Sequence, residues 1–170
     1  AHSTKDIRQT KLEGMLGMKK QITPLIVLTI ILFSSFSTLY RTTPVARATY
    51  VEGTIAQDTI WTLVDSPFVL SNNVIIDVAA TLTIEPGVQV RFGQDFSIIV
   101  KGSIKAEGNE EKKILFTPND PSQQLLWQTI LIRGNQPSSL VNCIIEGGTN
   151  GTTLESGELR LEKTIVRYNL

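Results

Sequence analysis

The sequence predicts an all-β solenoid, in which one chain of 170 residues winds through successive coils of short parallel strands. Three observations lead to this prediction. Apolar and polar residues alternate in very short bursts after residue 80, and no helical stripe of useful length follows residue 49. Glycine, proline and asparagine separate nearly every pair of bursts. Apolar positions also recur at a loose spacing of sixteen residues, which indicates a repeat.

The bursts are the predicted strands. Alternation at period two points one side chain into the core and the next outward. In chain order the predicted strands contain Leu82–Ile84, Val88–Phe92, Ile98–Val100, Ile104–Ala106, Ile114–Phe116, Ile130–Ile132, Val141–Ile145 and Leu159–Leu161. A further apparent strand, 164–168, ends the chain.

The segment Glu85-Pro86-Gly87-Val88 predicts a type II turn. Proline presets the first central φ angle of such a turn, and glycine accepts the positive second one. Glycines mark most of the other breaks between strands. Larger loops are expected at 118–121 and 135–139.

A sandwich or barrel is the other all-β fold with many short strands. Hairpin folds favour longer strands and two-residue Asn-Gly or Asp-Gly turns, and neither dipeptide joins two of these bursts. The sixteen-residue recurrence favours a solenoid, with the unit being either one face or one whole coil. The positions that recur are Ile84, Val100, Phe116 and Ile132, and then Ile145 and Leu161.

Residues 81–120 resemble secreted proteins with right-handed parallel β-helix repeats of the pectin-lyase-like kind. The motifs that carry the resemblance are Thr81–Val88, Val100–Gly108 and Ile114–Thr117, with Trp127 ahead of the next strand and Asp65–Phe68 ahead of the first coils. The resemblance spans roughly 52–168. It implies a right-handed parallel β-helix in residues 81–170, and residues 49–80 as an N-terminal capping segment. It also implies a protein of the bacterial or archaeal cell surface or extracellular space.

Solenoids need capped ends. The stretch Thr164–Tyr168 reads as an apparent strand with no polar cap after it. We therefore expect residues 81–170 to be β-helix coils truncated at the C-terminus, in the N-terminal part of a longer protein.

Residues 18–48 predict a secretory signal peptide. Met18-Lys19-Lys20 forms a positive start, 25–33 is an apolar run, and Ala46 and Ala48 fit the small-residue cleavage pattern. Cleavage is expected between Ala48 and Thr49. The alternative is an uncleaved membrane anchor over 22–40, weakened by five hydroxyl residues and a proline. Residues 1–17 precede the expected initiator, Met18, with Met15 as the alternative, and are interpreted as an upstream extension.

The formal net charge is zero, but basic and acidic residues are unevenly distributed along the chain. Residues 1–48 carry seven basic and two acidic side chains, whereas residues 49–170 carry nine basic and fourteen acidic ones. A basic leader on an acidic body is typical of a targeted protein and disfavours a nucleic-acid partner. Contact with a membrane is expected only through the leader, if it is not cleaved.

The residues after 48 contain no histidine and no methionine. Catalysis by a Ser-His or Cys-His pair therefore lacks its base, and the usual zinc and copper sites lack ligands. No cofactor is expected. The alternative is a polysaccharide lyase that uses Ca²⁺ and a basic residue, but no dense acidic cluster supplies the six to eight oxygens that Ca²⁺ prefers. The candidates would be Asp77, Glu85, Asp95, Arg91, Lys101, Lys105 and Arg133, which we interpret instead as solvated outward residues.

Four further features have a structural and a functional interpretation. Cys143 alternates with Val141 and Ile145 and is interpreted as a buried core residue rather than a reactive thiol. The charged run 107–113 is interpreted as a solubilising edge. Trp61 and Trp127 either pack against the coil or stack on sugar rings. Asn150 begins an Asn-Gly-Thr glycosylation sequence, in a setting that suggests an exposed loop.

Together these features predict an exported, non-catalytic β-helix module, extracellular or at the cell surface, that binds polysaccharide or other cell-envelope components or aids adhesion. The alternative is the N-terminal part of a carbohydrate-active enzyme, a polysaccharide lyase or glycoside hydrolase, whose site lies in C-terminal coils beyond residue 170. A stalk that binds nothing is a third reading.

Overall fold

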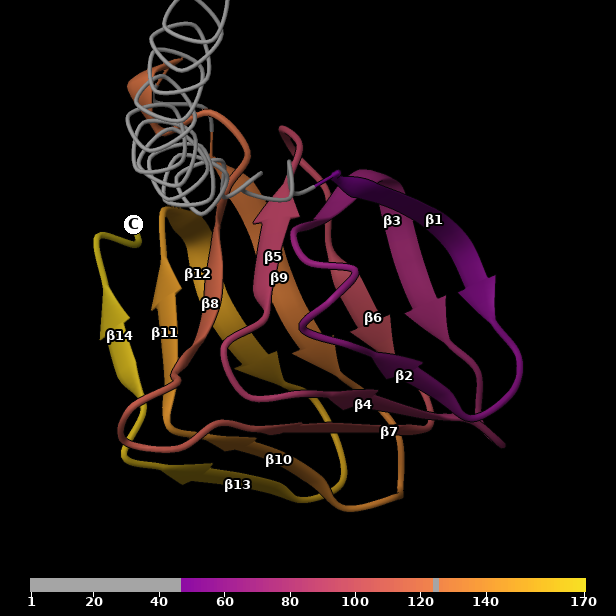
Figure 1. Cartoon of the computed structure of the whole chain (residues 1–170). Coiled ribbons are helices and arrows are strands. Elements are labelled where there is room, and N and C mark those ends of the chain that lie inside the picture. The colour runs from indigo at the N-terminus through magenta and orange to yellow at the C-terminus, as the bar shows by residue number, and fades with distance from the viewer. Residues whose placement is uncertain (1–46, 124–125) are drawn as a thin grey trace, which may run out of the picture. The chain divides into compact units, whose positions relative to one another are not determined.

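A computed structural model describes residues 47–123 and 126–170, and these residues form a parallel β-solenoid (Figure 1). The described part holds fourteen strands and one short 3-10 turn, η1 (Pro121–Gln123). None of its elements is a helix long and apolar enough to cross a membrane. The expected upstream extension, 1–17, and the expected signal peptide up to residue 46 lie outside the described residues.

One face of the solenoid is a five-stranded parallel sheet, called the first face here. Its order β13-β10-β7-β4-β2 skips one or two strands at each step, as expected when the chain visits other faces between visits to this one. The strands are β2 (Thr59–Trp61), β4 (Thr81–Ile84), β7 (Ser103–Glu107), β10 (Ser138–Val141) and β13 (Leu159–Glu162).

The other two faces belong to one nine-stranded sheet that is joined through β3 (Phe68–Ile76). The first half of β3 pairs with β5 and its second half pairs with β6. The second face continues from β5 (Gln89–Phe92) to β8 (Ile114–Pro118), β11 (Cys143–Glu146) and β14 (Ile165–Arg167). The third face continues from β6 (Ile98–Val100) to β9 (Trp127–Ile132) and β12 (Gly148–Leu154), while β1 (Thr49–Ile55) pairs with both halves of β3.

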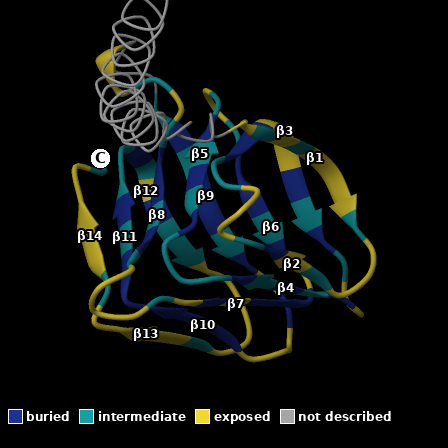
Figure 2. Cartoon of the chain, viewed as in Figure 1, coloured by how far each residue is buried: buried dark blue, intermediate teal, exposed yellow. Residues whose placement is uncertain are grey.

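The core consists of inward ladders in which each coil stacks on the next. On the first face, Ile84 pairs with Trp61 on one side and Ala106 on the other, and Ala106 pairs with Leu140. All four side chains are buried (Figure 2). Each large apolar side chain buried in this way contributes roughly 1.5–3 kcal/mol to folding, so stability grows coil by coil.

The expected turn at Glu85–Val88 is confirmed. Gly87 has a φ of +86°, and the amide of Val88 donates to the carbonyl of Glu85 at 3.3 Å. The glycine is required because its left-handed conformation costs other residues about 1–2 kcal/mol.

The spacing of sixteen residues matches neither the length of one face nor the length of one whole coil. Leu82 pairs with Ile104, twenty-two positions later, but Ala106 pairs with Leu140, thirty-four positions later. Coil length varies because the corners between strands vary in length. Successive recurring positions sit on different faces, with Ile84 in β4, Val100 in β6, Phe116 in β8 and Ile132 in β9, and only Val100 and Ile132, thirty-two positions apart, pair with each other.

Two segments differ in detail from expectation. The burst 141–145 is not one strand, because Asn142 has a φ of +49° and turns the chain from β10 on the first face to β11 on the second. The segment 49–80, expected as a cap, contains β1, β2 and β3, which pair in the same parallel sheets as the later coils. In their sheets β1 and β2 pair on one side only.

The strands β12, β13 and β14 form the other end of the described solenoid. Leu154, Leu161 and Val166 occupy inward register positions there, opposite Ile132, Leu140 and Ile145. Their exposed fractions are about half, at 50%, 50% and 51%.

Candidate functional site

Two adjoining hollows form a groove along the corner where the third face turns into the first. One hollow, of about 450 Å³, is lined by Lys101, Arg133, Gly134 and Asn135. The other, of about 430 Å³, is lined by residues that include Asp58, Ala80, Ser103, Lys105 and Pro137. Val78 and Gln136 line both hollows, so the two are continuous. We call this feature the corner groove.

Glycines stack at this corner and let successive coils lie close together. A Cβ atom added to Gly102 would lie 2.2 Å from the carbonyl oxygens of Asp77 and Ala80, and one added to Gly134 would lie 2.2 Å from the carbonyl oxygen of Lys101. The backbones of successive coils therefore approach more closely here than a side chain permits. The neighbouring side chains are left to form the walls.

The walls of the corner groove carry cations and amides. Lys101, Lys105 and Gln136 are exposed, and the structure shows no ion pair for either lysine within residues 47–123 and 126–170. Arg133 donates from Nε and Nη2 to one carboxylate oxygen of Glu155, at 3.1 and 2.8 Å. These groups donate hydrogen bonds to oxygen-rich ligands, and the lysines add positive charge.

The structure brings some of the sequence candidates together and separates others. Lys101, Lys105 and Arg133 all line the corner groove. The carboxylates that the alternative lyase reading would use for Ca²⁺ lie on three different corners. Asp77 lies between β3 and β4, Glu85 between β4 and β5, and Asp95 between β5 and β6.

Each of these carboxylates already accepts a local hydrogen bond, from the Val78 amide, the Leu63 amide and the Gln128 side chain respectively. Arg91 lies on the second face and donates to Gln89 at 3.0 Å. No group of three or more metal-binding side chains occurs within the residues that the structure describes.

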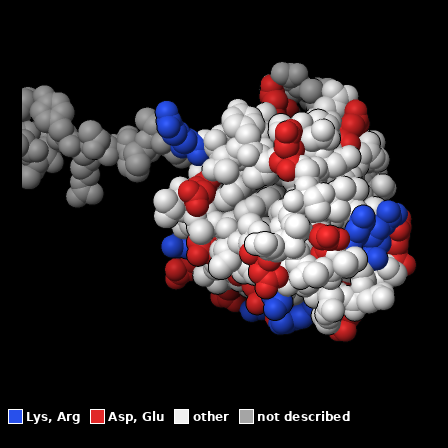
Figure 3. Space-filling model, turned by 90° about the vertical axis from the view of Figure 1, so that its right-hand side faces the viewer, with Lys and Arg blue, Asp and Glu red and all other residues white. Residues whose placement is uncertain are grey.

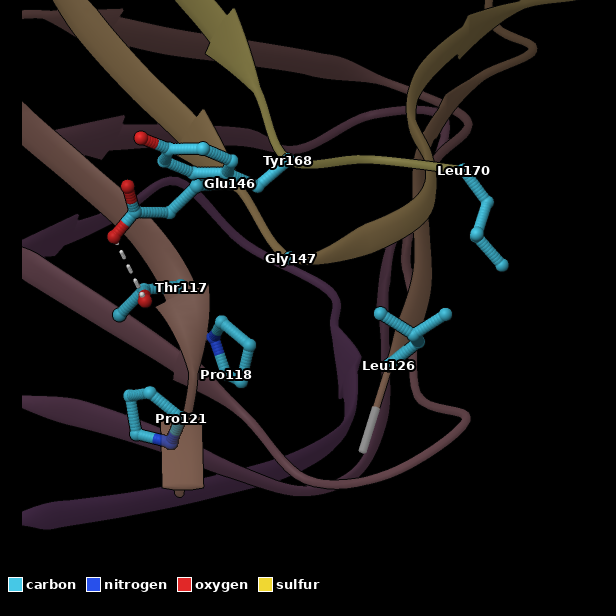
Figure 4. Close-up of a pocket in the computed structure, with 8 residues that line it drawn as sticks. All are labelled: Thr117, Pro118, Pro121, Leu126, Glu146, Gly147, Tyr168 and Leu170. Atoms are coloured by element: carbon cyan, nitrogen blue, oxygen red, sulfur yellow. Dashed lines mark hydrogen bonds between the residues drawn. The ribbon is translucent and has the colours of Figure 1, made fainter. Parts of the chain in front are cut away.

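Another hollow, apart from the corner groove and of about 520 Å³, lies where the second face turns into the third (Figure 4). Tyr168, Glu146 and Thr117 lie on one side of it, and Leu126 and Leu170 lie on the other. Pro118, Pro121 and Gly147 complete its lining. We call it the tyrosine hollow, and sequence reasoning did not find it.

Polar contacts fix the carboxylate of the tyrosine hollow. One oxygen of Glu146 accepts from the Thr117 hydroxyl at 3.3 Å, and the other accepts from Nε of Arg167 at 2.9 Å. The Arg167 guanidinium lies 5.3 Å from the centre of the Tyr168 ring. The ring itself is 78% exposed in the part of the chain that the structure describes.

Sugar stacking by Trp61 and Trp127 is ruled out by their burial. Their exposed fractions are 3% and 0%, and a stacking platform needs an open ring face. Trp61 stacks on Phe68 with ring centres 4.7 Å apart, and Trp127 stacks on Phe92 at 4.0 Å. The interpretation of both indoles as packing residues holds.

Cys143 is a buried, free core residue as expected. Burial raises the pKa of its thiol to about 12, which keeps the thiol protonated at neutral pH. Asn150 has an exposed side chain, but it lies in β12 at a register shift between Gly148 and Gly151 rather than in a loop. Its glycosylation stays a prediction, as does cleavage between Ala48 and Thr49.

The expected charged run follows β7 and forms the corner before β8. On the face shown in Figure 3, acidic side chains are scattered and basic ones gather beside them. Elsewhere, at the corner between β13 and β14, Lys163 lies 3.0 Å from Glu110. Their hydrogen bond raises the pKa of Lys163 and lowers the pKa of Glu110. Arg160 and Arg167, on β13 and β14, are ion-paired as well, unlike the lysines of the corner groove.

Comparison of the chain with protein-family models, with curated proteins and with solved structures gives no match.

Proposed function

We propose that the chain is an exported, non-catalytic β-helix module, extracellular or at the cell surface, that binds polysaccharide in the corner groove. The observation that carries the proposal is the gathering of Lys101, Lys105 and Arg133 with exposed amides in one continuous depression. The body around the groove carries more acidic than basic side chains. Lys101 and Lys105, for which the described part of the chain shows no ion pair, favour a ligand that bears carboxylate or sulfate groups.

The shape of the corner groove favours a polymer over a small molecule. Its walls come from three successive corners, at 77–80, 101–102 and 133–137. Neighbouring strands in a sheet lie about 4.8 Å apart, so a chain of sugars laid across the coils meets a similar corner at each step. Repeated weak contacts of this kind add up along a polymer.

Binding is tested with polygalacturonate, alginate and neutral xylan, by titration calorimetry on the full chain and on two variants. Lys101→Ala is expected to weaken binding of the acidic polymers about tenfold, which corresponds to about 1.4 kcal/mol. Lys112→Ala is the matched control, because Lys112 is an exposed lysine at the corner after β7. Equal losses in both variants, or no binding of any polymer, would contradict the proposal.

The same samples distinguish a binding module from an enzyme. Absorbance of unsaturated uronate products that grows with time and is abolished by EDTA would assign the chain to a lyase. Binding with no change in polymer length supports the module.

Export rests on the predicted signal peptide, 18–48. In the structure β1 begins at Thr49, directly after the expected cleavage point. We expect N-terminal sequencing of protein secreted by a bacterial host to begin at Thr49. Retention of Met18 would refute cleavage.

A further inference from the structure

We propose that the tyrosine hollow is a second carbohydrate site, which takes an uncharged N-acetylated sugar residue, with Tyr168 as the stacking platform and Glu146 as the hydrogen-bond acceptor. The site is separate from the corner groove. The two features have no lining residue in common.

The backbone of Tyr168 is the first reason to assign it a binding role. Arg167 pairs with Glu146 between β14 and β11, so Tyr168 follows β14 as Gly147 follows β11. Both residues have a positive φ angle, +71° for Gly147 and +55° for Tyr168. Glycine adopts this conformation at no steric cost, whereas a bulky aromatic residue is strained in it. Strained residues of this kind gather at binding and catalytic sites.

Hydrogen bonds from the next residue hold the strained tyrosine in place. The Asn169 side chain accepts from the Gly148 amide at 2.7 Å, and it donates to the carbonyls of Ile145 and Arg167 at 3.2 and 3.0 Å. These bonds hold the backbone at Tyr168, so a ligand that stacks on the exposed ring does not have to order the backbone beneath it.

The lining then selects the class of ligand. An aromatic face attracts the apolar C–H face of a sugar ring. A carboxylate that already accepts hydrogen bonds has further lone pairs that can accept from hydroxyl or amide donors. Leu126 and Leu170 on the other side of the hollow match a methyl group, which an acetamido substituent supplies. No lining residue that the structure describes is a cation, and Arg167 beside the hollow is already paired with Glu146, so a uronate carboxylate finds no ion-pair partner there. The volume of about 520 Å³ lies within the range of small-ligand pockets.

The test uses the full chain and two trisaccharides, the β-1,4-linked trimer of N-acetylglucosamine and cellotriose, which lacks the acetamido groups. Titration calorimetry is expected to show binding of the N-acetylated trimer at least tenfold tighter than cellotriose. Equal affinity for the two sugars, or binding of neither, would overturn the proposal.

Tyr168→Gly separates binding from folding. The change removes the platform and relieves the backbone strain, so we expect at least tenfold weaker binding of the N-acetylated trimer with a Tm that is unchanged or higher. Tyr50→Ala is the matched control, because Tyr50 is also an exposed tyrosine, at 71%, but lies in β1. Unchanged binding in Tyr168→Gly overturns the proposal, and so does a Tm loss as large as that of a core substitution.

Two further variants keep this site distinct from the corner groove. Glu146→Gln retains the shape of the side chain and removes its charge, so it is expected to weaken binding of the N-acetylated trimer. Lys101→Ala is expected to leave that binding unchanged. If Lys101→Ala weakens the trimer as much as Tyr168→Gly does, the ligand lies in the corner groove and the second site is refuted.

Discussion

Replacement of Trp127 by phenylalanine tests how the interior of the solenoid is packed. The indole of Trp127 is fully buried, stacks on Phe92 with ring centres 4.0 Å apart, and donates from Nε1 to the carbonyl of Glu146 at 2.9 Å. Phenylalanine keeps the stack but removes the N–H donor and about three heavy atoms. The lost hydrogen bond costs about 1 kcal/mol, and the cavity adds about 2 kcal/mol.

The expected destabilisation of about 3 kcal/mol is a large part of the 5–15 kcal/mol that typically stabilises a domain. Urea unfolding of both proteins, followed by circular dichroism and by the fluorescence of the remaining Trp61, measures it through the midpoint at constant slope. Ile60→Ala is the control, because Ile60 is 62% exposed and its loss is expected to cost under about 0.5 kcal/mol. A change under 1 kcal/mol in Trp127→Phe, or ready quenching of both tryptophans by acrylamide in the native protein, would refute the buried stack.

Two further substitutions test the core thiol and the glycine corner. Because burial raises the pKa of the Cys143 thiol from 9.0 to about 12, the unfolded chain loses the thiol proton first as pH rises. This contribution to stability is complete below pH 9 and falls by about 1.4 kcal/mol for each pH unit up to 12. Urea midpoints of wild type and Cys143→Ala should therefore converge above pH 9, and parallel curves would contradict the raised pKa. Gly102→Ala forces a Cβ to within 2.2 Å of two carbonyl oxygens and is expected to cost about 2–4 kcal/mol. Gly53→Ala meets nothing within 4 Å and should cost only about 1–2 kcal/mol, from its positive φ; equal thermal shifts in both would disprove close coil contact.

The positions of most strands could be predicted because each strand carries its own alternation. The two inward residues of β4, Leu82 and Ile84, are buried, and the outward Thr83 between them is partly exposed. The turn at 85–88 was predictable for a similar reason, since proline and glycine restrict φ locally. The burial of Cys143 followed from the same alternation.

Coil length was not predictable, because the register between coils is decided by contacts between residues twenty or more positions apart. A corner of one residue, such as Asn142, and a corner of several, such as 133–137, leave the same alternation on either side. The strand β12 was missed because its sequence is polar and rich in glycine. It forms through pairing with the apolar strand β9, which is a tertiary contact and not a local preference.

For the candidate sites, too, sequence reasoning found what depends on local pattern and missed what depends on the tertiary fold. Sequence reasoning named Lys101 and Lys105 among the candidate basic residues, and both line the corner groove. It selected the two tryptophans for sugar stacking by residue type, and both are in the core. The exposed aromatic ring beside a hollow belongs to Tyr168, whose positive φ angle no sequence pattern indicates.

Amide shift mapping of the isotope-labelled chain, titrated with an oligomer of the tightest-binding acidic polymer, tests most directly whether a polysaccharide lies in the corner groove. We expect the largest shifts at the backbone amides of Gly102, Gly134 and Gln136, with the oligomer unchanged in length after the titration. Shifts that gather on another face of the solenoid, or none at saturating oligomer, would contradict a polysaccharide site at this corner.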